Sequence, residues 1–268
     1  MGILNVTPDS FSDGGSYTTP EAVRKRVAEM IGEGADIIDV GGESTRPGFK
    51  SVDVNEELKR VIPAVKLIKE EFDIPVSVDT TKTAVAEEAL SAGAFMINDV
   101  SGLFMARSMT ELIASKEAFC CLVHNRKEVL RVTDTIEYLE SVCSELESIA
   151  AAAEKAGIRH ESIILDPGIG FAKTHEQNMM ILSNLEHFRK LGYPLLLGAS
   201  RKSVIGNILG LPPSERTEGT IALSVLAAGA GFGFVRVHDI KENKRAVLMT
   251  ESLKSFRRER RGAWTISR

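Results

Sequence analysis

Five clusters of polar residues carry the side chains with which this chain could do chemistry. Each cluster follows a short apolar run: N-V-T-P-D-S-F at 5–11, G-G-E-S-T-R-P-G at 41–48, D-P-G-I-G-F-A-K at 166–173, S-R-K-S at 200–203 and R-V-H-D at 236–239. Buried strands that end abruptly in amides, carboxylates and basic groups are typical of the active rim of a parallel barrel. The pattern therefore predicts an enzyme.

The elements that would position these clusters alternate between short apolar strands and longer helices. Strands are predicted near 2–6, 36–40, 75–79, 94–98, 118–123, 162–166, 194–198 and 233–237. Amphipathic helices, with apolar residues three or four positions apart, are predicted at 22–31, 56–69, 82–90 and 138–157. Gly34, Gly93 and Gly157 stand where such helices commonly end.

Eight strand–helix units without a low-complexity linker predict one domain over residues 1–268, an α/β fold with a single (β/α)8 TIM barrel. Two connections, 7–19 and 41–54, are long and rich in Gly, Ser, Thr, Pro and Asp, as mobile lids on an active rim often are. The basic segment 254–268 is interpreted as the solvated end of the last helix with a loose tail.

Composition limits the partners of the chain. A net charge of −4 and an isoelectric point near 5.8 argue against a nucleic-acid partner. The longest uncharged stretch, 219–235, is too short for a convincing membrane span, and no signal sequence opens the chain. Three cysteines without metal-type spacing indicate reduced core thiols. A cytoplasmic location is therefore expected.

Four hydrogen-bonding residues come at the ends of predicted strands two, three, four and six: Asp39, Asp79, Asn98 and Asp166. Any one of them could be a turn former or a helix cap. A closed barrel, however, would turn all four toward one cavity, and this convergence favours a binding site.

Asn5 and Lys202 each have two interpretations. Asn5 ends the first strand and offers a neutral oxygen to Mg²⁺, or it stabilises the turn that follows. Lys202 follows the seventh strand, where its ammonium could reach a bound ligand, or it is a surface lysine in the first turn of a helix, an unfavourable position relative to the helix dipole. Its neighbour Arg201 is expected to brace the rim through carboxylates.

Arg236 and His238 alternate with valines, so on a strand both point to the same face. Two basic groups at the mouth of the eighth strand would form an anion site. The alternative for Arg236 is a structural ion pair with Asp239 or Glu242.

Taken together, the polar clusters resemble the dihydropteroate synthase family, and the resemblance runs from Gly2 to Asp239. It implies condensation of hydroxymethyl-dihydropterin pyrophosphate with p-aminobenzoate, releasing pyrophosphate in folate biosynthesis, with Mg²⁺ as cofactor. It also implies a homodimer and sensitivity to sulfonamides, which mimic p-aminobenzoate. Ala172 departs from the F-G-K usual in this family, and it could place Phe171 and Lys173 differently because alanine disfavours positive φ.

The resemblance also implies roles for individual residues. It assigns the pterin site to Asp39, Asp79, Asn98, Asp166, Lys202 and Arg236. It assigns the p-aminobenzoate site to Thr45, Arg46, Pro47, Phe171, Lys202 and Ser203. It assigns the pyrophosphate site to Asn5, which also binds the metal, Arg46, Arg236 and His238. The residues expected to act in catalysis are Lys202, Arg236, His238 and Asp79.

Two other functions remain open from the sequence. A pterin-dependent methyltransferase would share the pterin carboxylates but has no need of the T-R-P-G, S-R-K-S and R-V-H clusters. A non-catalytic pterin-binding paralogue should have lost some polar strand ends, and every one is present. Both alternatives are therefore weaker than the synthase.

Overall fold

Eight parallel strands form the centre of the molecule in the computed structural model, which describes residues 1–7, 19–43, 52–102, 106–126 and 128–262. The strands are β1 (Gly2–Asn5), β2 (Ile38–Gly41), β3 (Val76–Asp79), β4 (Met96–Asp99), β5 (Phe119–Val123), β6 (Ile163–Asp166), β7 (Leu196–Leu197) and β8 (Phe234–Val235). β1 to β6 pair in chain order, and β7 pairs with β8. Two bridges, Leu165 with Leu195 and Gly2 with Val237, join these sheets and close the barrel.

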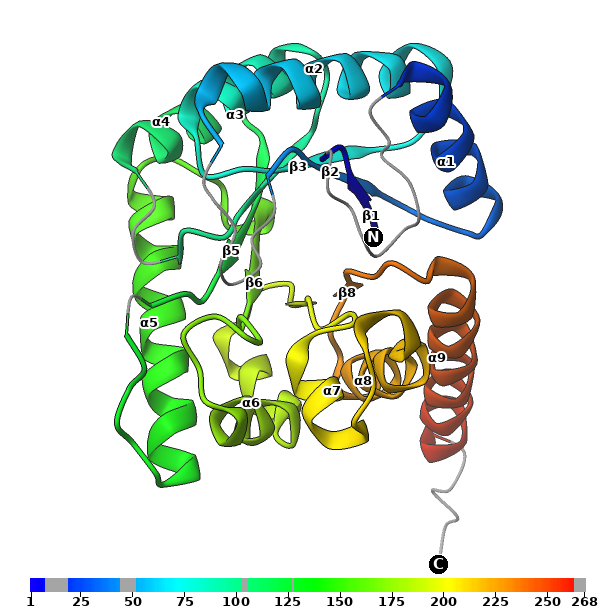
Figure 1. The fold of residues 1–268 in the computed structure, drawn as a ribbon. Coiled ribbons are helices and arrows are strands. Elements are labelled where there is room, and N and C mark those ends of the chain that lie inside the picture. The colour runs from blue at the N-terminus through cyan, green and yellow to red at the C-terminus, as the bar shows by residue number, and fades with distance from the viewer. Residues whose placement is uncertain (8–18, 44–51, 103–105, 127, 263–268) are drawn as a thin grey trace, which may run out of the picture.

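Helices surround the strands, as Figure 1 shows. They are α1 (Pro20–Gly32), α2 (Val54–Glu71), α3 (Thr83–Ser91), α4 (Arg107–Ser115), α5 (Thr135–Lys155), α6 (His175–Leu182), α7 (Ser203–Leu209), α8 (Thr217–Ala230) and α9 (Ile240–Gly262). Every strand is followed by at least one helix, and both α7 and α8 follow β7. The predicted (β/α)8 barrel is confirmed.

The predicted elements lie close to the observed ones. All eight strands form at the predicted places, with β2 and β4 each extending one residue further, to Gly41 and Asp99, and β7 and β8 reduced to two residues. The four predicted helices are α1, α2, α3 and α5. Gly34, Gly93 and Gly157 follow helix ends with φ near +100°, which glycine tolerates without steric cost.

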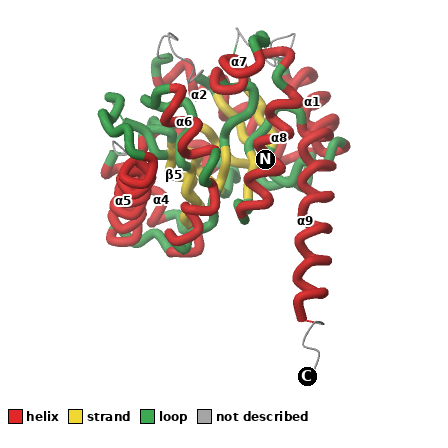
Figure 2. Tube along the Cα trace, turned by 90° about the horizontal axis from the view of Figure 1, so that it is seen from below, coloured by secondary structure: helices red, strands yellow, loops and turns green. Residues whose placement is uncertain are grey.

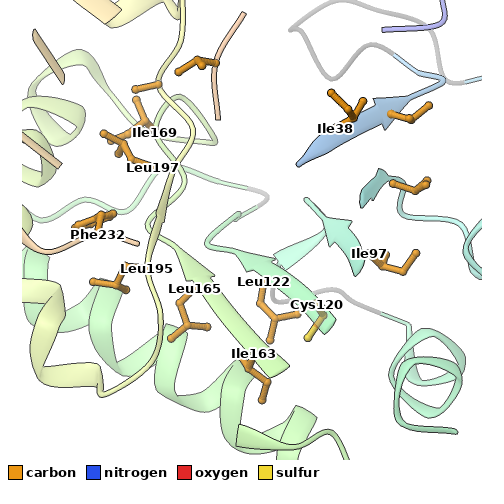
Figure 3. Packing of buried hydrophobic residues seen from close by; sticks show 14 of the residues in the cluster. Ile38, Ile97, Cys120, Leu122, Ile163, Leu165, Ile169, Leu195, Leu197 and Phe232 are labelled. Carbon is orange, nitrogen blue, oxygen red and sulfur yellow. The ribbon is translucent and has the colours of Figure 1, made fainter. Parts of the chain in front are cut away.

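Side chains of the strands alternate between two cores. Outward-facing residues pack against the helices, and Figure 3 labels members of this cluster on neighbouring strands, Cys120 and Leu122 on β5 beside Ile163 and Leu165 on β6. A smaller cluster occupies the barrel interior and comprises Met96, Cys121, Val123, Ile164 and Leu196. The apolar interior layer supports the polar side chains at the carboxyl ends of the strands.

The last helix differs from the others because it continues past the body of the barrel, which Figure 2 shows clearly. α9 includes residues 254–262 of the basic segment, as expected, and the predicted tail beyond Gly262 lies outside the described residues. No helix in the described part of the chain combines the length and apolarity needed to cross a membrane.

Candidate active site

Arg236 forms the centre of the site by joining two carboxylates across the barrel interior. Its Nε donates to Asp39 Oδ2 at 2.6 Å, and its Nη2 donates to Asp79 Oδ2 at 2.7 Å. The arginine follows β8, whereas the carboxylates belong to β2 and β3. The alternative pairing of Arg236 with Asp239 or Glu242 is therefore wrong, because Arg236 pairs with the two carboxylates predicted to bind the pterin.

Asp39 and Asn98 lie deeper than strand ends. Asp39 is the second residue of β2, and Asn98 is the third residue of β4, so the prediction that they end their strands is wrong by one or two positions. Both are buried, and Asn98 Nδ2 donates to Asp39 Oδ2 at 3.2 Å. Asp39 Oδ1 and Asn98 Oδ1 accept no hydrogen bond in the structure as described. Buried acceptors of this kind are costly unless a ligand satisfies them.

The site contains more negative charge than Arg236 neutralises. The pKa of Asp79 is raised to about 7, chiefly by burial, with Arg236 opposing the shift and the neighbouring Asp39 and Asp99 adding to it. In return, the two carboxylates raise the pKa of Arg236 against the effect of burial, so the guanidinium stays charged. The pocket is thus suited to a ligand that donates hydrogen bonds.

Asp166 and Lys202 form the second half of the pocket. Asp166 ends β6 as predicted, and its Oδ1 accepts a hydrogen bond from Gly168 N at 2.7 Å, so it also performs the turn-forming role that was its alternative. Lys202 is the residue before α7, and its ammonium donates to Ile169 O and lies 4.5 Å from the centre of the Phe171 ring. Burial lowers the pKa of Lys202 to about 8. The surface-lysine interpretation is therefore wrong.

His238 lies at the rim, where β7 and β8 end. Its Nδ1 is 2.9 Å from Ser200 Oγ, and that same hydroxyl accepts a hydrogen bond from His238 N at 3.2 Å. The hydroxyl and the ring nitrogen can each be the donor, depending on the tautomer of His238, and the two contacts together hold the imidazole against Ser200. Arg201 pairs with Asp239 at 2.5 Å, which confirms its predicted role as a brace.

Asn5 ends β1, as predicted, and lies beside Gly41 at the end of β2. A Cβ atom placed on Gly41 would come 3.5 Å from Asn5 Oδ1, so the glycine keeps the space beside the amide open. No group of three or more acidic, histidine or cysteine residues that could hold a metal occurs in the described ranges. The side chain of Asn5 offers one neutral oxygen of the kind that Mg²⁺ accepts as a ligand.

The structure brings most of the predicted residues together. Hydrogen bonds, electrostatic interactions and one cation–ring contact join these residues into one cluster: Asp39, Asp79, Asn98, Asp166, Phe171, Lys202 and Arg236. Ser203 is exposed at the start of α7. Asn5 lies at the end of β1, and His238 lies beside Ser200. The other three predicted residues, Thr45, Arg46 and Pro47, lie outside the described residues.

Sequence reasoning did not assign roles to two residues that shape the site. Lys173 donates two hydrogen bonds within the loop after β6 and a third to His124 O after β5, and Ser200 orients His238. Both belong to polar clusters noted in the sequence, which was the available signal. Ala172 adopts φ +42°, the left-handed conformation that a glycine would reach more easily.

Comparisons with known proteins agree with this geometry. The sequence model of the family described as "Pterin binding enzyme" matches residues 1–238. A dihydropteroate synthase of Clostridium beijerinckii is 52% identical over 255 residues, covering 94% of this chain and 92% of the relative.

Solved structures agree as well. The Clostridium difficile dihydropteroate synthase crystallised in the presence of pteroic acid is 48% identical with a TM-score of 0.88, covering 94% of this chain and 95% of its own. The Xanthomonas albilineans dihydropteroate synthase with 4-aminobenzoic acid is 40% identical with a TM-score of 0.87, covering 95% and 92%. The chain therefore belongs to the dihydropteroate synthase family of pterin-binding enzymes.

Proposed function

We propose that this chain condenses hydroxymethyl-dihydropterin pyrophosphate with p-aminobenzoate to give dihydropteroate and pyrophosphate. This reaction joins a pterin to an arylamine in folate biosynthesis. The observation that carries the proposal is the buried group formed by Asp39, Asp79, Asn98 and Arg236 at the carboxyl ends of the strands. The relatives' names and their ligands support the same reaction.

The pterin head fits the acceptor-rich end of the pocket. A pterin presents an amino group and a ring N–H, and the carboxylates of Asp39 and Asp79 accept such donors in pairs. The two buried oxygens that no described residue satisfies, on Asp39 and Asn98, add acceptors. Asp166 and Lys202 complete the rim of this pterin site, the lysine as the donor that can meet the pterin carbonyl.

The pyrophosphate tail fits the basic mouth of the barrel. Arg236 pairs with the carboxylates of Asp39 and Asp79, and His238 lies beyond the end of β8 with its Nδ1 beside Ser200 Oγ. Arg46 is proposed to join them from the second loop. Mg²⁺, bound through Asn5 and the phosphate oxygens, would supply further charge neutralisation for the leaving group.

The reaction then needs little from the protein beyond positioning and charge. The arylamine nitrogen forms a bond to the pterin methylene carbon, the carbon–oxygen bond breaks with its electron pair on pyrophosphate, and the nitrogen loses a proton. An arylamine is neutral at pH 7 and requires no strong base. Arg236 and His238 stabilise the charge of the departing group, and no covalent enzyme intermediate is required.

The p-aminobenzoate site is proposed beside Lys202. Phe171 supplies an aromatic wall, with the Lys202 ammonium 4.5 Å from its ring centre. Ser203 follows at the start of α7, and Thr45, Arg46 and Pro47 would complete the site from the second loop. In this arrangement Lys202 lies between the two substrates.

We further propose a cytoplasmic homodimer. All three cysteines are free and buried, as suits a reducing compartment. α8 and α9 pack against each other and expose large apolar side chains, namely Leu226, Leu248, Met249, Leu253 and Phe256, each at least half exposed. A second copy covering these side chains would remove that surface from water. Sedimentation of the chain and of Leu253→Glu tests this, with a monomeric variant expected.

The test of function is a coupled assay for pyrophosphate after mixing both substrates with the protein. Wild type should release pyrophosphate only when both substrates and Mg²⁺ are present. Lys202→Met should lose most of this activity, whereas Lys155→Met, which removes an exposed lysine at the end of α5, should retain it. Tight binding of the pterin substrate without pyrophosphate release would refute the synthase and favour the non-catalytic or methyltransferase alternatives.

A further inference from the structure

Lys173 holds the loop that follows β6 by binding its backbone from within. The side chain turns back into the loop, where Nζ donates to Gly168 O at 2.8 Å, to Phe171 O at 3.1 Å and to His124 O at 3.1 Å. An ammonium has three N–H donors, so all three are used. His124 follows β5, and the ammonium therefore ties the β6 loop both to itself and to the neighbouring strand.

The loop needs such a clamp because its backbone is tightly folded. Gly168 and Gly170 have φ values of +71° and +85°, and Ala172 has φ +42°. A Cβ atom on Gly168 would lie 2.0 Å from His124 O, so the loop is pressed directly against the end of β5. Several carbonyl oxygens consequently converge at one point, and the amine donates to each of them. Burial lowers the pKa of Lys173 to about 7, and in the protonated form the positive charge also offsets the mutual repulsion of the carbonyl groups.

The clamp acts on the residues that form the proposed arylamine wall. Phe171 contributes both the carbonyl that Lys173 binds and the ring that lies 4.5 Å from Lys202 Nζ. Lys202 in turn donates to Ile169 O in the same loop. A change in the backbone at Phe171 therefore moves the aromatic wall and alters the surroundings of the Lys202 ammonium.

Other anchors hold the loop in place independently. Asp166 Oδ1 accepts from Gly168 N at 2.7 Å, and Asn178 Oδ1 accepts from Gly170 N at 2.7 Å. Thr174 and Gln177 form a capping box that starts α6. Loss of the ammonium should thus leave the loop attached at Gly168, Gly170 and Thr174 while releasing the carbonyl of Phe171.

We propose that Lys173 is a positioning residue for the arylamine subsite, acting through the backbone of the β6 loop on Phe171. It touches neither substrate and serves the binding of the second substrate rather than that of the pterin. This inference rests on the proposed function, because it concerns the arylamine that the synthase would bind.

The first experiment compares Lys173→Met with wild type in the pyrophosphate-release assay, varying each substrate in turn. We expect the KM for p-aminobenzoate to rise at least tenfold, with the KM for the pterin pyrophosphate within twofold of wild type. Lys173→Arg, which keeps a charged donor, should recover part of the loss. Lys155→Met serves as the control for removal of a lysine charge and should change neither KM.

A double-mutant cycle then asks whether Lys173 acts through Phe171. In a Phe171→Ala background the Lys173→Met change should raise the p-aminobenzoate KM less than threefold, because the wall it positions is already gone. Full additivity of the two changes would overturn the inference. If Lys173→Met does not fold, Lys173→Arg replaces it in the same double-mutant cycle. The p-aminobenzoate KM should then rise by a smaller factor, and this rise should disappear in the Phe171→Ala background.

The outcomes separate this inference from the proposed function. If wild type releases no pyrophosphate from the two substrates, the proposed function fails. If wild type is active and Lys173→Met changes both KM values equally, or lowers only the melting temperature, Lys173 is a structural residue and the inference fails. A selective rise in the p-aminobenzoate KM, abolished in the Phe171→Ala background, supports it.

Discussion

Asp79→Asn should make the folded protein more stable at neutral and alkaline pH while removing pterin binding. Asp79 is 8% exposed and shares Arg236 with Asp39, so one guanidinium faces two buried carboxylates. Replacing one carboxylate by an amide of the same shape leaves Arg236 paired with the other. Breaking a buried ion pair usually destabilises a protein because one charge is left buried without a partner. In Asp79→Asn no buried charge is left in this way.

The magnitude follows from the pKa of Asp79. Burial raises this pKa from 3.8 to about 7, and each pKa unit corresponds to about 1.4 kcal/mol, so the ionised carboxylate costs the folded state at most about 4 kcal/mol. The pKa of about 7 already includes the attraction of Arg236 for the carboxylate, so that contribution is not subtracted a second time for an amide that resembles the protonated acid. We therefore expect a net stabilisation of up to about 4 kcal/mol above pH 7.

The sign of the pH dependence is fixed by the direction of the shift. Because the folded state binds the Asp79 proton more tightly than the unfolded state, wild-type stability falls as the pH rises from about 4 to about 7. The substitution removes this loss. The stability difference between Asp79→Asn and wild type should therefore increase over that range and be complete above pH 7.

Urea unfolding at pH 5 and pH 8 measures the effect, with calorimetric titration of a pterin analogue on the same samples. Asp36→Asn is the matched control, because Asp36 is exposed and its pairing with Lys244 should matter by less than about 0.5 kcal/mol. A variant that is less stable than wild type at pH 8 would show that the Asp79–Arg236 pair outweighs burial. Unchanged pterin affinity would remove Asp79 from the site.

Three further outcomes are expected. Gly168→Ala should lose at least about 2 kcal/mol of stability, since its Cβ would overlap His124 O. Gly192→Ala, with φ +76° and open surroundings, should lose only about 1–2 kcal/mol from backbone strain, and equal losses of the two variants in denaturant titration would contradict this. Affinity for a pterin analogue should fall by up to about tenfold per pH unit above pH 8, where Lys202 loses its proton. If the affinity of a Lys202→Met variant falls equally steeply with pH, Lys202 is not the cause of the decrease. Chelation of Mg²⁺ should abolish pyrophosphate release yet leave the affinity for a phosphate-free pterin, measured by calorimetry, unchanged, because the metal is proposed to bind through Asn5 and the phosphates. Loss of that pterin affinity would place the metal at the pterin head instead.

The sequence was sufficient to predict the strands because two signals coincide at each of them. An apolar run of about five residues is followed directly by a polar cluster, and this boundary marks where a buried parallel strand reaches the rim. It correctly located the ends of β3 and β6 at Asp79 and Asp166. It placed the ends of β2 and β4 one or two residues too early, at Asp39 and Asn98. These polar side chains lie inside the barrel, and their strands continue past them to the rim.

The partners within the site could not be predicted. Alternation along the eighth strand predicts that Arg236 and His238 share a face, but β8 ends at Val235, and alternation does not tell how far a long side chain reaches. Arg236 is 197 residues from Asp39, and its choice of Asp39 and Asp79 over the nearby Asp239 depends on barrel closure. The role of Lys173 depends likewise on carbonyl groups, whose directions follow from local φ values that residue types alone do not determine.

The pairing of Arg236 gives the pocket a competition that bears on substrate recognition. The carboxylates of Asp39 and Asp79, which accept from Arg236 through Oδ2, are the same groups that a pterin's amino and ring N–H donors would approach. A ligand that donates to these carboxylates weakens the hold on the guanidinium, and the guanidinium then favours a nearby anion. A pterin without phosphates supplies only the first half of this exchange. A pterin pyrophosphate supplies both halves, so its two ends should bind more tightly together than the sum of their separate affinities predicts.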